Sequence, residues 1–130
     1  LDQQVLRKGD WSVKLPNVAP GGWAFEYKNY FYPDTDDTAV ALIALSQFRR
    51  TGPKAERIEE AIRLGVDWLI AMQCRGGGWG AFDKDNDKKF LTKIPFCDFG
   101  EALDPPSVDV TAHIVEAFGK LGLGKDHPSM

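Results

Sequence analysis

Residues 34–48 read DTDDTAVALIALSQF, an acidic block that runs directly into an apolar stretch. The carboxylate of Asp36 or Asp37 can cap the start of a helix here. Gly52-Pro53 would stop that helix, so we expect it to run from the acidic block to about Arg50. Apolar side chains recur in it about every three to four residues, as on the buried face of a helix: Val40, Ile43, Leu45 and Phe48.

Two further segments carry a helical pattern. The first runs from about Lys54 to Gln73, before three glycines, and the second begins near Ser107, after a Pro-Pro pair. Residues 5–33 and 74–105 show no sustained helical period, and such long loops are usually functional. The expected class is therefore all-α with elaborate loops. The two apolar stripes are Ile58, Ile62, Gly65, Trp68, Leu69 and Met72, and Val110, Ile114, Ala117, Phe118 and Leu121.

Composition sets limits on function. The 130 residues would suit one domain, but the absence of an initiator methionine leads us to expect a piece of a longer chain. A net charge of −3 gives no reason to expect a nucleic-acid partner. No apolar run approaches a transmembrane length, so membrane contact would be peripheral or lie elsewhere. Four Trp and eight Phe indicate core packing or an aromatic-lined cavity.

A short pattern occurs twice. Gln4 precedes Gly9-Asp10-Trp11, and Gln73 precedes Gly77-Gly78-Trp79. The near-equal offsets, 69 residues for Gln and 68 for Trp, predict a helical-hairpin repeat, with coincidence as the alternative. In such a repeat the Gln amide can cap a helix terminus while the indole packs beside it.

The acidic block could also carry chemistry. Three carboxylates within residues 34–37 repel one another, and an apolar cavity would add desolvation, so the pKa of at least one should rise. A carboxyl that keeps its proton near neutral pH can act as a general acid. A helix start decorated with acids and a Mg²⁺ site are the alternatives. His113 shares a helix face with Asp109 and could be its proton partner.

A second acidic run, residues 83–87, begins like a calcium-binding loop. Its sixth position is Lys88 rather than Gly, and its twelfth is Ile94 rather than Glu. We therefore interpret it as a structural or solvated loop. Cys74 and Cys97 have no spacing typical of a zinc site, and a disulfide framework is not expected.

Taken together, five segments resemble the squalene–hopene cyclases, a family of class II triterpene cyclases. Residues 32–40, YPDTDDTAV, resemble the family's Asp-x-Asp-Asp-Thr-Ala block, and residues 21–25, GGWAF, lie upstream at the family's distance. Residues 77–83, GGWGAFD, resemble its Gln/Trp repeat and the loop that follows. Residues 94–100, IPFCDFG, and 104–113, DPPSVDVTAH, also match.

The resemblance covers essentially the whole sequence. It implies that residues 1–130 are part of an (α/α) barrel domain, cut at both ends, of an enzyme with two such domains. The implied reaction is acid-initiated cyclisation of squalene to hopene, or to hopanol when water quenches the final cation. The resemblance implies neither a cofactor nor a metal.

The resemblance also assigns roles in proton transfer. Asp36 matches the acid that protonates the terminal alkene, and His113 matches the histidine that hydrogen-bonds this acid and sharpens its acidity. Apolar surroundings are expected to keep Asp36 protonated at rest. Asp34 and Asp37 match the neighbouring carboxylates, and Asp109 matches a carboxylate of the same network.

Four further residues match positions around the substrate. Phe25 matches an aromatic whose π face stabilises developing carbocations. Phe82 occupies another cavity position, which is often Tyr in relatives and here lacks the hydroxyl. Phe96 and Cys97 match the constriction between the substrate channel and the cavity.

A water-insoluble substrate implies a membrane as its source, with peripheral binding at the cytoplasmic face of the cell membrane. The resemblance is also compatible with a homodimer of the complete enzyme. One alternative is a cyclase of another linear terpene, such as tetraprenyl-curcumene. Another is a non-catalytic prenyl- or lipid-binding α/α module, which would not need the acid motif.

Overall fold

The computed structural model describes residues 1–48, 52–87 and 103–130. Three α-helices form the framework: α1 (Thr35–Ser46), α2 (Ala55–Met72) and α3 (Val108–Leu121), preceded by the short 3₁₀ helix η1 (Asp10–Val13). Within those ranges, pairing between extended segments is limited to isolated bridges. The all-α class expected from the sequence is confirmed.

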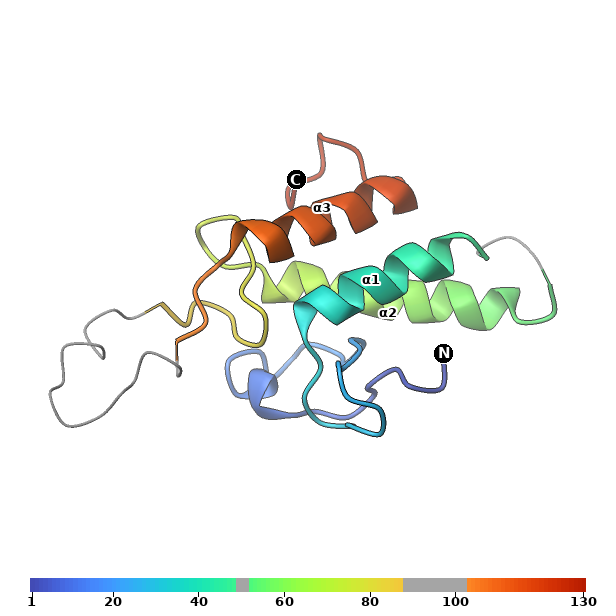
Figure 1. Cartoon of the computed structure of the whole chain (residues 1–130), viewed down its shortest axis with the longest axis horizontal. Helices are drawn as coiled ribbons and strands as arrows, with labels where there is room; N and C mark the ends of the chain where they lie inside the picture. Colours follow the sequence, from blue (N-terminus) through green and yellow to red (C-terminus); the bar gives the residue numbers. More distant parts are fainter. Residues whose placement is uncertain (49–51, 88–102) are drawn as a thin grey trace, which may run out of the picture.

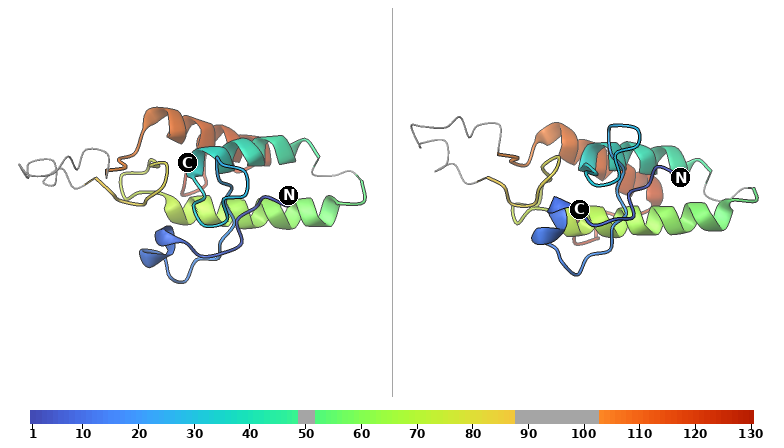
Figure 2. Two further views of the ribbon diagram at one scale, coloured as in Figure 1. Left: turned by 60° about the horizontal axis from the view of Figure 1, so that its bottom comes forward. Right: turned by 90° about the horizontal axis from the view of Figure 1, so that it is seen from below.

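The three helices lie close together, with α1 packed against both α2 and α3 (Figure 1). The N-terminal segment runs along α2 and covers a side that the other helices leave free (Figure 2). Gly21 allows this close approach, because a Cβ at Gly21 would lie 2.3 Å from the Leu64 carbonyl oxygen of α2.

The core forms where the helices meet. Trp68 is fully buried and meets Trp11 edge to face, with ring centroids 5.8 Å apart. Trp79 meets Phe118 in the same manner at 6.0 Å. Every residue of the two apolar stripes predicted for α2 and α3 is buried, so both predictions are confirmed.

The stripe predicted for α1 is wrong at two of its four positions; the other two, Ile43 and Leu45, are partly buried against the core. Val40 is 51% exposed and Phe48 is 59% exposed. The buried face of α1 instead consists of Thr35, Thr38, Ala39 and Leu42. Since α1 is apolar on most of its sides, hydrophobic periodicity does not single out one face.

The start of α1 also differs from the prediction. Asp34, rather than Asp36 or Asp37, is the N-cap: its backbone is extended, and its Oδ1 accepts a hydrogen bond from the Asp37 N–H at 2.7 Å. The helix ends at Ser46, short of Arg50, which lies outside the described residues.

The second glutamine–tryptophan pair lies at the end of α2, but the tryptophan rather than the glutamine caps this helix terminus. The Gln73 amide donates to the Gly77 carbonyl at 2.7 Å and to the Ser129 carbonyl at 3.2 Å. The indole N–H of Trp79 donates to the Leu69 carbonyl, in the last turn of α2, at 2.6 Å. The Trp79 bond satisfies a carbonyl that the end of α2 would otherwise leave unpaired, whereas the Gln73 amide bonds carbonyls that lie outside the helices.

The first pair is arranged differently. The Gln4 amide donates to the Gly21 carbonyl at 2.7 Å and to the Ala61 carbonyl, inside α2, at 2.9 Å. The buried indole N–H of Trp11 has no hydrogen-bond partner in the described part of the chain. A common repeat behind the two pairs stays a prediction.

Candidate active site

The acidic block lies at the N-terminus of α1, where Asp34 links two segments. Its side chain is 4% exposed. Oδ1 caps α1, and Oδ2 accepts a hydrogen bond from the Phe25 N–H at 3.1 Å. The backbone of Trp23 pairs with that of Asp34 in an isolated bridge. The segment that carries Phe25 is therefore held against the start of the helix.

Burial raises the pKa of Asp34 to about 7, because the ionised carboxylate loses solvation there. The neighbouring Asp37 carboxylate adds to the rise, while the two main-chain N–H donors oppose it. The sequence predicted one carboxyl of raised pKa in this block, and the structure assigns that property to Asp34.

Asp36 projects from the first turn of α1 towards α3. Its Oδ1 lies 2.5 Å from His113 Nδ1, the distance of a short hydrogen bond. The carboxylate raises the pKa of His113, first through this hydrogen bond and then through its charge. The side chains of Asp36 and His113 are 43% and 48% exposed. Within this chain, the expected apolar surroundings of Asp36 are therefore not formed.

The remaining acids of the expected network lie around this pair. Asp109 is exposed, and a hydrogen bond from the Ser107 side chain lowers its pKa. The charge of Asp109 makes a small contribution to the raised pKa of His113. Asp37 is partly exposed; its main-chain N–H donates to Asp34 Oδ1, and its side chain also contributes to the raised pKa of Asp34.

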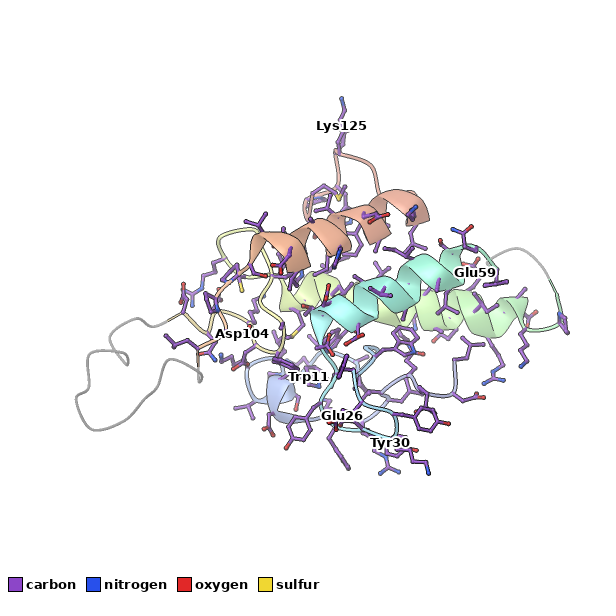
Figure 3. All side chains as sticks on the ribbon, viewed as in Figure 1. Trp11, Glu26, Tyr30, Glu59, Asp104 and Lys125 are labelled. Carbon is purple, nitrogen blue, oxygen red and sulfur yellow. The ribbon has the colours of Figure 1, made fainter. Side chains whose placement is uncertain are left out.

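The two candidate aromatic residues lie on loops. Phe25 is 83% exposed and Phe82 is 57% exposed. Phe82 shares a hollow of about 350 Å³ with Trp11, Tyr32, Pro33 and two aspartates. Tyr30 and Glu26 mark the outer edge of the loop that follows Phe25 (Figure 3). Phe96 and Cys97 lie outside the described residues.

Sequence reasoning missed one acid. Asp104 accepts hydrogen bonds from the main-chain N–H groups of Ala81 at 2.8 Å, Phe82 at 2.5 Å and Asp83 at 2.7 Å. Figure 3 shows it beside the loop that follows α2, ahead of α3. No local pattern marks a carboxylate whose donors lie more than twenty residues upstream. The available signals were the position of Asp104 before Pro105-Pro106 and its place in the segment 104–113 that resembles the family.

The second acidic run is a structural loop. Asp85 accepts hydrogen bonds from Arg75, from its main-chain N–H at 2.9 Å and from its Nε at 3.1 Å. Within residues 1–48, 52–87 and 103–130, no group of three or more His, Cys, Asp or Glu side chains could hold a metal ion. In the same ranges, no helix has the length and apolar character needed to span a membrane.

A carboxyl–imidazole pair at a helix N-terminus can take part in proton transfer, and the loops that carry Phe25 and Phe82 present exposed aromatic rings. The chain belongs to the squalene–hopene cyclase family: the model of that family's C-terminal domain matches residues 1–130. This domain belongs to the terpenoid cyclase (α/α) barrel superfamily.

Three curated relatives illustrate the match. The squalene–hopene cyclase of Alicyclobacillus acidocaldarius is 52% identical over 94% of this chain, that of Schizosaccharomyces japonicus is 50% identical over 96%, and that of Zymomonas mobilis is 44% identical over 98%. The chain spans 18% to 20% of the length of these relatives.

Proposed function

We propose that this chain is the acid-bearing part of a longer triterpene cyclase that converts squalene to hopene and hopanol. The observation that carries the proposal is the 2.5 Å contact between Asp36 Oδ1 and His113 Nδ1. It joins the first turn of α1 to α3 within a chain that belongs to the squalene–hopene cyclase family. A prenyl-binding module would have no use for a paired acid at this position.

In the proposed first step, protonated Asp36 transfers its proton to the less substituted carbon of the terminal alkene of squalene. The O–H bond breaks, a C–H bond forms, and a tertiary carbocation remains. An alkene is a very weak base, so the acid must be strong at the moment of transfer. An imidazolium at His113 that donates its Nδ1–H to Asp36 Oδ1 stabilises the carboxylate as it forms.

The following steps need a dry cavity. Each alkene attacks the preceding cation and closes a ring, until loss of a proton gives hopene or addition of water gives hopanol. The π faces of Phe25 and Phe82 stabilise the cations, and exclusion of water prevents early quenching. Both rings are exposed in this chain. We therefore propose that the rest of the enzyme closes the cavity around them and around Asp36.

Further aspects concern the complete enzyme. A substrate as apolar as squalene dissolves in lipid rather than in water, which supports a membrane as its source and peripheral binding at the cytoplasmic face. Asp109 is proposed to add negative charge near His113, whose pKa is raised mainly by Asp36 and to a small extent by Asp109. The assignment of Phe96 and Cys97 to the channel constriction stays a prediction. A homodimer of the complete enzyme also stays a prediction.

The proposal is tested with the full-length chain that carries these residues. The chain is expressed in a host without triterpene cyclases and incubated with squalene, and the products are analysed by gas chromatography–mass spectrometry. Hopene, with or without hopanol, is the expected product. If another linear terpene is cyclised and squalene is not, that terpene is the substrate instead of squalene. If squalene binds without turnover, the result favours a lipid-binding module.

A further inference from the structure

The loop that carries Phe82 is held by a carboxylate from the other end of a long connection. Asp104 Oδ1 accepts the N–H of Ala81, and Oδ2 accepts the N–H groups of Phe82 and Asp83. Three main-chain donors thus converge on one side chain. Since both carboxylate oxygens are engaged, Asp104 is poorly placed to exchange protons with a substrate, and its geometry is that of an anchor.

The same loop is also tied to α1. The main-chain N–H of Thr35 donates to the Ala81 carbonyl at 2.8 Å, and its hydroxyl donates to the Gly80 carbonyl at 2.7 Å. Thr35 is fully buried, and it directly precedes Asp36. The loop is therefore attached to the helical turn that presents the proposed acid.

Close packing at Gly80 leaves the loop little freedom to shift. A Cβ at Gly80 would lie 2.5 Å from the Asp104 main-chain oxygen and 2.8 Å from Asp104 Oδ2. Gly80, Asp104 and Thr35 therefore form a clamp in which each contact depends on the others. The main-chain position of Phe82 is set by this clamp.

We propose that Asp104 and Thr35 are positioning residues that fix Phe82 relative to Asp36 and thereby determine how far the cationic cyclisation proceeds. The inference rests on the proposed cyclase function. A ring stabilises a cation only within about 6 Å of its centroid, and a misplacement of about 1 Å can cost a hundredfold in rate. A cation that lacks this support loses a proton to a base or to water before the next ring closes. The product is then an alkene with fewer rings.

The test uses the full-length enzyme with squalene and three variants. Asp104→Asn keeps the shape of the side chain but replaces one acceptor oxygen by a donor, and Thr35→Val removes the hydroxyl at nearly constant volume. Thr35→Ser keeps the hydroxyl and should keep the wild-type products. We expect Asp104→Asn and Thr35→Val to raise the fraction of products with fewer rings at least tenfold, while total squalene consumption falls by a smaller factor.

Two controls separate positioning from general damage. Asp126→Asn makes the same carboxylate-to-amide change at an exposed residue away from the clamp and should leave the product pattern unchanged. Adding Asp104→Asn to Phe82→Ala should shift the products little beyond Phe82→Ala alone, because Asp104 is proposed to act through Phe82.

The inference is overturned if Asp104→Asn and Thr35→Val fold and consume less squalene but keep the wild-type ratio of products. It is also overturned if Asp104→Asn and Phe82→Ala shift the products additively. If Asp104→Asn does not fold, Thr35→Val and Thr35→Ser decide the question. If the wild-type enzyme does not cyclise squalene or another linear terpene, the proposed cyclase function itself is wrong.

Discussion

At the scale of single residues, Asp36 and His113 meet although 77 positions separate them in the sequence. Under the proposed function, Asp36→Asn in the full-length chain should reduce squalene turnover by at least about a hundredfold, since general-acid catalysis is typically worth 10²–10⁴-fold. Asp36 is 43% exposed and is not the helix cap, so the thermal unfolding midpoint should change little. Turnover is measured as product per enzyme by gas chromatography. Near-normal turnover in the folded variant would show that Asp36 is not the acid.

The pair should also be visible in the ionisation of His113. The Asp36 carboxylate raises the pKa of His113 above its ordinary value of 6.5. Since this charge favours the imidazolium, the half-exposed pair makes a small contribution to stability at pH values below 6.5, and this contribution disappears as the pH rises through the raised pKa. In ¹³C-histidine NMR titrations, Asp36→Asn should lower the pKa of His113 towards 6.5. An unchanged titration would contradict the pairing, and His127 serves as the internal reference.

Asp34 should make stability depend on pH. Its pKa rises from 3.8 to about 7 because the buried carboxylate is poorly solvated. The protonated form therefore stabilises the fold below pH 3.8, and this contribution is lost as the pH rises through 7, with an upper bound of about 4 kcal/mol at about 1.4 kcal/mol per pKa unit. Asp34→Asn cannot ionise, so its urea midpoint should fall less than that of the wild type between pH 4.5 and 7.5. Parallel profiles would show that Asp34 is ionised throughout.

At the residue scale, the sequence motifs predicted which two side chains would meet, while the roles of these residues stay predictions. Asp36 and His113 were singled out through their motifs, and the structure brings them together. The cap was assigned to the wrong acid because capping rules accept any of three adjacent carboxylates. No sequence pattern revealed the hydrogen bonds of Asp104, since bonds to distant main-chain groups demand no neighbouring residue type.

At the scale of elements, the buried face of a helix could be predicted from the sequence only where the helix is clearly amphipathic. Helices α2 and α3 each have one apolar stripe and one polar face, so their buried residues could be read from the sequence. Helix α1 buries two threonines because their hydroxyls bond main-chain carbonyls, Thr35 to Gly80 and Thr38 to Asp34. Buried polar side chains with long-range partners cannot be found from hydrophobic periodicity.

The packing of the N-terminal segment on α2 leads to a test with two glycines. A Cβ at Gly21 would lie 2.3 Å from the Leu64 carbonyl oxygen, so Gly21→Ala must displace backbone and should cost about 2 kcal/mol. A Cβ at Gly119, inside α3, would meet nothing within 4 Å. Gly119→Ala should therefore stabilise by about 0.5–1 kcal/mol through helix propensity. Urea unfolding of both variants measures the difference. Equal effects would disprove the close packing at Gly21.

At the scale of the whole molecule, much apolar surface remains uncovered. Val108 is 88% exposed and Phe25 is 83% exposed. A groove of about 640 Å³ runs along the outer side of α2, where Ile62 and Val66 meet Leu123. Three helices do not determine how a barrel closes, so the barrel could be predicted only through the family resemblance and not from helix patterns.

These surfaces predict the behaviour of the 130-residue chain by itself. The chain spans only 19% of the length of its Alicyclobacillus acidocaldarius relative, and Asp36, Phe25 and Phe82 are open to water. Water would hydrate the carboxyl group and quench any cation before a second ring closed. We therefore expect the isolated chain to form no hopene from squalene under conditions in which the full-length enzyme does, as measured by gas chromatography–mass spectrometry. Its uncovered apolar surface should also bind a hydrophobic dye more strongly, per residue, than the full-length enzyme does. Detectable hopene from the isolated chain would mean that these residues alone exclude water around Asp36, and that the proposed closure by the rest of the enzyme is wrong.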